Sequence, residues 1–106
     1  MEFKELQDFI TLENDRLKSK YGNYSDEEKR ILARTVKMTE EVGELCEQVL
    51  MHSNLQRQEK LDNKSKDDLS EEFADVIITT MLLAKSMNVD LETALKNKIE
   101  KINKRY

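Results

Sequence analysis

The chain has 106 residues, 38% of them charged, with a formal net charge of -4, one cysteine and no proline. This length suits a single domain over residues 1–106, and the mixture of charges excludes the broad basic surface that binds nucleic acid polymers. The lone Cys46 excludes an intrachain disulfide, and the N-terminus lacks the basic and apolar segments of a signal peptide. We therefore expect a cytoplasmic protein that does not span a membrane.

The scarcity of glycine and proline favours long helices. Apolar residues three and four apart predict a first helix over residues 2–20, which a turn at residues 21–24 ends. Ser25 and Glu28 have the spacing of a capping box, so we expect Ser25 to cap a second helix that frays in the polar run 53–66. Its expected buried stripe consists of Ile31, Leu32, Met38, Val42, Leu45, Val49 and Leu50.

A loop at residues 63–66 precedes the third predicted helix. We expect Ser65 or Asp67 to be its N-cap, and its last residue to be about Met87. Its apolar residues cover more than one narrow face, which predicts that it is the most buried helix. Asn88 is suited to end it in a left-handed conformation.

Asp90 is the expected N-cap of a fourth helix over residues 91–104. The apolar stripe of this helix consists of Leu95, Ile99, Ile102 and Tyr106. The pattern as a whole predicts an all-α protein, a bundle of four helices. Because a chain of this size buries a limited core, we expect oligomerisation to complete the bundle.

Carboxylates flank the apolar stripes of two consecutive helices. Glu41 and Glu44 share one face of the second helix, and Glu72 and Asp75 share one face of the third. Such anions raise each other's cost of ionisation, and a divalent cation would offset that cost. Oxygen ligands with no histidine or cysteine nearby favour Mg²⁺ or Mn²⁺ over zinc or copper. Each motif alone is weak, so a metal site and a solvated helix flank both remain open on this pattern.

Lys98, Lys101 and Arg105 lie on one face of the fourth helix and could meet phosphates. The alternative is that they only oppose the helix dipole, as cations near a helix C-terminus commonly do. Tyr21 and Tyr24, in the turn before the second helix, could stack on a base or simply cover the core.

Four segments in this order resemble the MazG-like, all-α nucleoside triphosphate pyrophosphohydrolases. KMTEEVGEL at residues 37–45 is similar to the EExxE helix of the family, and EEFADV at residues 71–76 is similar to its ExxD helix. MNVDLE at residues 87–92 and KIEKINKRY at residues 98–106 are similar to the family's tail. The resemblance covers roughly the last two thirds of the chain.

The resemblance implies a site and an activity. The implied Mg²⁺ ligands and catalytic residues are Glu41, Glu44, Glu72 and Asp75, with Glu40 as an auxiliary acid. The implied phosphate contacts are Lys98, Lys101 and Arg105. The family hydrolyses nucleoside triphosphates between the α and β phosphates, giving a monophosphate and pyrophosphate, and its members assemble as dimers or tetramers. The tryptophan that some relatives place against the base is missing, which leaves base recognition to Tyr21 or Tyr24 as candidates.

Two alternatives stay open. A related helical family acts on phosphoribosyl-ATP, and activity on that substrate alone would favour it. In another class, the chain would be a non-catalytic helical interaction module whose acidic face binds a basic partner. Mg²⁺ separates these classes, because a metal site raises the melting temperature and a solvated acidic face does not.

Overall fold

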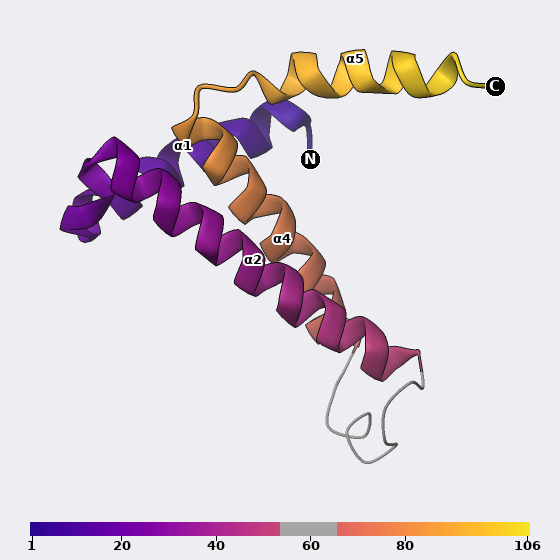
Figure 1. The fold of residues 1–106 in the computed structure, drawn as a ribbon, viewed down its shortest axis with the longest axis horizontal. Coiled ribbons are helices and arrows are strands. Elements are labelled where there is room, and N and C mark those ends of the chain that lie inside the picture. Colours follow the sequence, from indigo (N-terminus) through magenta and orange to yellow (C-terminus); the bar gives the residue numbers. More distant parts are fainter. Residues whose placement is uncertain (54–65) are drawn as a thin grey trace.

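The computed structural model describes residues 1–53 and 66–106, and this part of the chain contains no strand. The elements are α1 (Phe3–Lys20), the short 3-10 helix η1 (Gly22–Ser25), α2 (Glu27–His52), α4 (Lys66–Ser86) and α5 (Leu91–Asn103). Figure 1 shows α2 and α4 running along each other, with α1 across one end of the pair and α5 leaving from the same end. The predicted all-α class with four α-helices is confirmed.

The start of α2 differs from the prediction by one residue. Asp26 is the N-cap, and its Oδ1 accepts a hydrogen bond from the Lys29 amide at 2.9 Å. The hydroxyl of Ser25 instead donates to the Gly22 carbonyl at 2.7 Å, inside η1. The prediction of Ser25 as the cap is therefore wrong, because the 3-10 turn uses that hydroxyl and the next residue satisfies the helix end.

The connection between α4 and α5 follows the prediction. Asn88 has a φ of 56°, and the Val89 amide donates to the Ala84 carbonyl at 3.0 Å, which closes α4 in a left-handed turn. The Oδ1 of Asp90 then accepts from the Thr93 amide at 3.1 Å and caps α5.

The start of α4 gives a mixed result. The predicted loop residues 63–65, Ser65 among them, lie outside the described residues, and Asp67 lies within α4 and is not its cap. In the single chain α4 leaves Phe73 and Ile77 50% and 53% exposed.

A small apolar core joins α1 to the C-terminal half of α4. Ile10, Met81 and Leu82 are buried in it. The apolar residues that pack around them are Phe3, Leu6, Leu17, Ile78 and Leu91. Its described members come from α1, α4 and the first residue of α5, and none of them comes from α2.

Three of the four buried residues of α2 are polar, and the fourth is Met51. Arg34, Glu41 and Gln48, here called the inner line, are buried and lie seven residues apart, which is about two helical turns. The predicted apolar stripe of α2 is wrong in part, because four of its members are exposed. These members are Leu32, Val42, Val49 and Leu50.

Small and apolar residues form a second line on α2, here called the outer line, which is exposed along its length. Its members alternate at spacings of four and three residues: Leu32, Val36, Thr39, Gly43, Cys46 and Leu50. That spacing is typical of a helix face that packs on another helix. Nothing in the described chain lies within 4 Å of where a Cβ on Gly43 would stand. The outer line is thus uncovered in a single chain.

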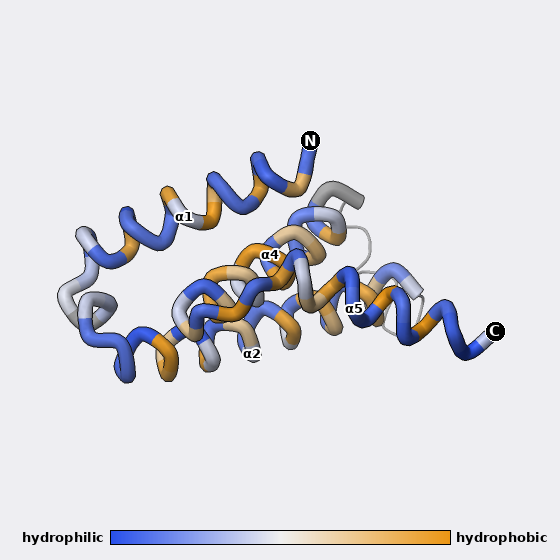
Figure 2. Tube along the Cα trace, turned by 90° about the horizontal axis from the view of Figure 1, so that it is seen from above, coloured by the Kyte–Doolittle hydropathy of each residue, from blue (hydrophilic) through white to orange (hydrophobic). Residues whose placement is uncertain are grey.

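Helix α5 does not pack into the bundle. Leu91 contacts the core, but every residue from 92 to 106 is exposed. Apolar and polar residues alternate along α5, and its C-terminal end extends beyond the other helices in both views (Figures 1 and 2). Among the described helices, none has the length and apolar content that a membrane crossing requires.

Candidate metal centre

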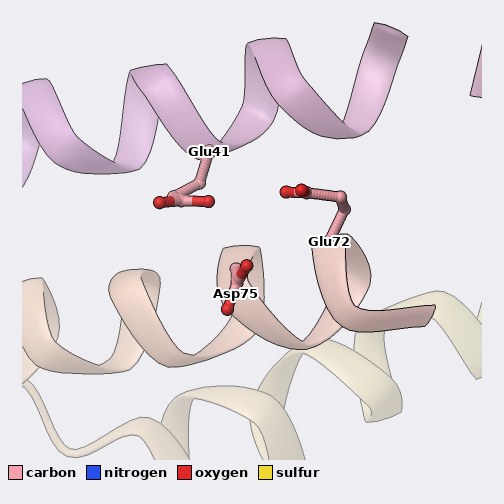
Figure 3. Close-up of side chains that lie close together, drawn as sticks. All are labelled: Glu41, Glu72 and Asp75. Atoms are coloured by element: carbon pink, nitrogen blue, oxygen red, sulfur yellow. The ribbon is translucent and has the colours of Figure 1, made fainter. Parts of the chain in front are cut away.

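Three carboxylates meet between the middle of α2 and the first half of α4. Glu41 comes from α2, and Glu72 and Asp75 come from one face of α4 (Figure 3). One carboxylate oxygen from each lies within 4.8 Å of the others. We call these three residues the acidic group. The structure therefore brings Glu41 together with two residues that follow it by 31 and 34 positions in the sequence.

Glu41 is the most buried member of the acidic group, with 6% of its surface exposed. Its Oε1 lies 3.1 Å from the Lys37 ammonium, whereas its buried Oε2 has no hydrogen-bond partner. Leaving a buried polar atom without a partner costs about 1–3 kcal/mol, and more for a charged group. A cation between α2 and α4 would remove that cost.

Glu72 is the group on which the crowding of charge acts most clearly. Burial raises the pKa of its carboxyl, and the negative charges of Glu44, Asp75 and Glu41 raise it further. A hydrogen bond with Glu44 acts in the same direction. Its Oε2 is buried without a hydrogen-bond partner, like the Oε2 of Glu41. Two unpartnered oxygens thus belong to the same acidic group.

The donor set fits a hard divalent cation. All the members are carboxylates, and the described acidic group contains no histidine or cysteine. Oxygens on opposite sides of one Mg²⁺ lie about 4.2 Å apart, since each Mg–O distance is about 2.1 Å. The spread of at most 4.8 Å is close to this value, so small side-chain adjustments would suffice.

Glu44 and Glu40 lie outside the acidic group. Glu44 is exposed on α2, although it is near enough to Glu72 to share a hydrogen bond with it. The carboxylate of Glu40 is exposed and lies 3.8 Å from the Lys37 ammonium. Of the four predicted carboxylate ligands, the structure thus places three together and one at the rim.

The three predicted phosphate contacts are not brought to the acidic group of their own chain. Lys98, Lys101 and Arg105 are all exposed on or just after α5, which leaves from the opposite end of α4 (Figure 1). Their role in binding phosphate stays a prediction.

The two candidate base contacts pack against each other. The rings of Tyr21 and Tyr24 are 5.6 Å apart between centroids, and the Tyr24 ring lies 5.5 Å from the Arg34 guanidinium carbon. Tyr21 is half exposed. Their contact with a base also stays a prediction.

Sequence reasoning missed two cations on the inner side of α2. Arg34 is 2% exposed, and its Nη1 donates to the side chains of Asn14 and Ser86 and to the Leu82 carbonyl. Burial lowers the pKa of Arg34, and the nearby charge of Arg30 lowers it further.

Lys37 is the second of these cations, and it contacts the site directly. The hydrogen bond and the charge of Glu41 raise the pKa of Lys37. Lys37 and Arg34 precede Glu41 by four and seven residues, spacings that place them on the same side of the helix. That spacing is the signal that could have identified both.

One comparison with known proteins identifies a family. A model of the MazG-like family matches residues 32–106, a segment that contains Arg34, Lys37 and the whole acidic group. No curated protein and no solved structure gives a significant match. Helix α1 lies outside the matched segment.

Proposed function

The chain belongs to the MazG-like family, and from this premise we propose that it is a divalent-cation-dependent nucleoside triphosphate pyrophosphohydrolase. The family suggests a pyrophosphohydrolase-type function on nucleotides. The observation that carries the proposal is Glu41, a buried carboxylate with one oxygen unpartnered beside Glu72 and Asp75. A solvated acidic surface for a basic partner would not bury that oxygen.

In this proposal Glu41, Glu72 and Asp75 hold Mg²⁺ or Mn²⁺, and Glu44 lies at the rim of the group. A bound divalent cation supplies charge stabilisation at phosphoryl oxygens and acidifies water. The described chain offers Glu44 as the base, because its carboxylate is exposed to solvent and close to the group. Glu41 is less suited to that role, since it is buried and holds the cation in this proposal.

The proposed reaction is attack of water on the α phosphorus of the nucleotide. The bond between that phosphorus and the α–β bridging oxygen breaks, and the products are a nucleoside monophosphate and pyrophosphate. Glu44 takes a proton from the attacking water, and its place at the edge of the site suits passing that proton to solvent. A role in removing unwanted nucleotides would follow from such an activity.

We also propose that the working form is a homodimer or homotetramer. The outer line of α2 is self-complementary, because Leu32 and Leu50 close its ends while Thr39 and Gly43 keep its middle narrow. Helix α5 supports the same proposal, since an isolated helix of 13 residues is marginal in water. Lys98, Lys101 and Arg105 would then meet phosphates bound by a neighbouring subunit.

Release of pyrophosphate tests the proposal. The chain is incubated with Mg²⁺ and a panel of canonical and modified nucleoside triphosphates, and with phosphoribosyl-ATP as a separate arm. We expect turnover that chelation abolishes. Activity on phosphoribosyl-ATP alone would identify the related enzyme instead. No turnover, together with no effect of Mg²⁺ on the melting temperature, would favour the non-catalytic interaction module.

A further inference from the structure

The ion pair of Lys37 and Glu41 joins an exposed side chain to a buried one. The ammonium of Lys37 lies 3.1 Å from Glu41 Oε1 and 3.8 Å from Glu40 Oε2. The Lys37 side chain is 53% exposed, whereas that of Glu41 is 9% exposed. The lysine can therefore leave without a cost in packing, and the carboxylate cannot.

Local helix stability does not account for this pair. A lysine placed four residues before a glutamate is the less favourable of the two orders for an ion pair on a helix. Lys37 instead counters charge in the site. Its ammonium pairs with Glu41, a member of the acidic group, and so offsets one carboxylate charge of that group.

We propose that Lys37 changes partners during ligand binding. While no divalent cation is present it neutralises Glu41, and once a cation engages Glu41 the ammonium contacts a phosphate oxygen of the substrate. The inference rests on the proposed function and deepens it, because it assigns a substrate-binding cation. A lysine ammonium suits this exchange, since it is a compact charge with three donors on a flexible stem.

The Lys37 side chain also borders a small cavity of about 40 Å³. Its lining residues are Leu17, Tyr24, Arg34, Lys37, Thr79 and Leu82. On α4, Thr79 lies one helical turn after Asp75, and on α2, Lys37 lies one helical turn before Glu41. Lys37 therefore contacts both the cavity and the acidic group.

Buried charge beside that cavity has the sign that attracts phosphate. The three hydrogen-bond acceptors of the Arg34 guanidinium are neutral, and its Nε and Nη2 have no hydrogen-bond partner. Burial and the charge of Arg30 lower the pKa of Arg34, whereas the negative charge of Glu13 also acts on Arg34 and raises its pKa. Because Lys37 lies between Arg34 and Glu41 along α2, a phosphate that meets its ammonium lies on the N-terminal side of Glu41.

Two binding measurements on the full chain test the exchange. Lys37→Met removes the ammonium and keeps the stem, and Lys29→Met makes the same charge change at an exposed position of α2 two turns earlier. Calorimetry measures Mg²⁺ alone, and then a triphosphate with a non-hydrolysable α–β link at saturating Mg²⁺. We expect Lys37→Met to bind Mg²⁺ about threefold to tenfold tighter and the triphosphate about tenfold weaker, where tenfold equals 1.4 kcal/mol. Lys29→Met should match the unmodified chain in both.

The exchange predicts that Lys37→Met raises the affinity for Mg²⁺ and lowers the affinity for the triphosphate. Mg²⁺ affinity that is unchanged or lower in Lys37→Met, or triphosphate affinity that is unchanged, would overturn the inference. Lys37→Gln provides a second neutral variant with a polar end and should behave in the same way. If the unmodified chain binds neither Mg²⁺ nor the triphosphate, the proposed function itself fails.

Discussion

The inner line of α2 and the C-terminal helix α5 are both rich in charge, yet they use it differently. On the inner line, Arg34 and Glu41 are buried against α4, and each keeps polar atoms without a partner. On α5, every charged residue is exposed, and Lys96 pairs with Glu92 at 3.3 Å on the helix surface. The two patterns look alike in the sequence, but only the charges of the inner line have lost most of their contact with water.

The difference teaches where to look for a ligand in a small helical protein. An exposed charge is solvated already, so a ligand gains little by meeting it. A buried charge with an unpartnered atom has lost its water and has not been compensated. Glu41 and Glu72 are in the second situation, and Lys98 and Lys101 are in the first.

The largest effect should follow from removing the negative charge of Glu41 on the inner line. Glu41→Gln should remove pyrophosphate release and the stabilisation by Mg²⁺, because the most buried ligand is lost. For the unmodified chain that stabilisation is about 2.7 kcal/mol at a Mg²⁺ concentration 100 times Kd. Thermal melting with and without Mg²⁺ measures it, and circular dichroism checks that helicity is kept. Glu47→Gln, an exposed change on the same helix, is the control, and an equal Mg²⁺ shift in both variants would contradict the assignment.

A smaller loss is expected from the α5 cations. Changing Lys98, Lys101 and Arg105 together to methionine should weaken triphosphate binding about tenfold, or 1.4 kcal/mol, and leave the Mg²⁺ shift unchanged. Mixing this variant with the Glu41→Gln variant should restore part of the activity if α5 serves a neighbouring subunit. Lys96→Met is the matched control. If the triphosphate affinity equals that of the control, the α5 cations do not contact phosphate.

Assembly provides a third comparison, between the inner and outer lines of one helix. Val36→Glu should reduce the mass measured by light scattering, because a charge would be buried where α2 meets a second copy. The stability of the single chain should change little, since substitutions at exposed positions usually change the free energy of unfolding by less than about 0.5 kcal/mol. Ser19→Glu, exposed on α1, is the control. A monomeric mass for the unmodified chain would exclude this role of the outer line.

The smallest effect concerns pH. The raised pKa of Glu72 means that the fold favours the protonated carboxyl more than the unfolded chain does. Its stabilising effect is present below the ordinary glutamate pKa and is lost as pH rises through the raised value. Glu72→Gln should therefore stabilise the metal-free chain at neutral pH, by less than about 1 kcal/mol, and flatten this part of the pH profile. Urea unfolding at several pH values with a chelator measures it, and an unchanged slope would show that burial and neighbouring charge do not raise this pKa.

Local sequence signals predicted the helices and most of their ends. Asn88 and Asp90 act as predicted because a left-handed turn and an N-cap depend on adjacent backbone groups. Ser25 and Asp26 show the limit of such signals, since both residue types can cap a helix and only the geometry of η1 selects between them.

The covering of apolar faces could not be predicted. Periodicity identifies an apolar face of a helix but not what packs on it, and in the single chain Leu32 and Ile77 remain exposed. The same limit applies to the site. Spacing predicted the carboxylates, but the unpartnered oxygen of Glu41 and its pairing with Lys37 depend on how closely α2 and α4 approach.

The hydrogen bonds of Arg34 have a consequence for cooperativity. One nitrogen of α2 holds Asn14 of α1 and Leu82 and Ser86 of α4 at the same time. Helix α1 lies outside the segment that matches the family, yet its Asn14 accepts a hydrogen bond from Arg34, which lies inside that segment. Opening α1 would leave a buried guanidinium short of an acceptor, so the three helices should exchange their amide hydrogens as one unit.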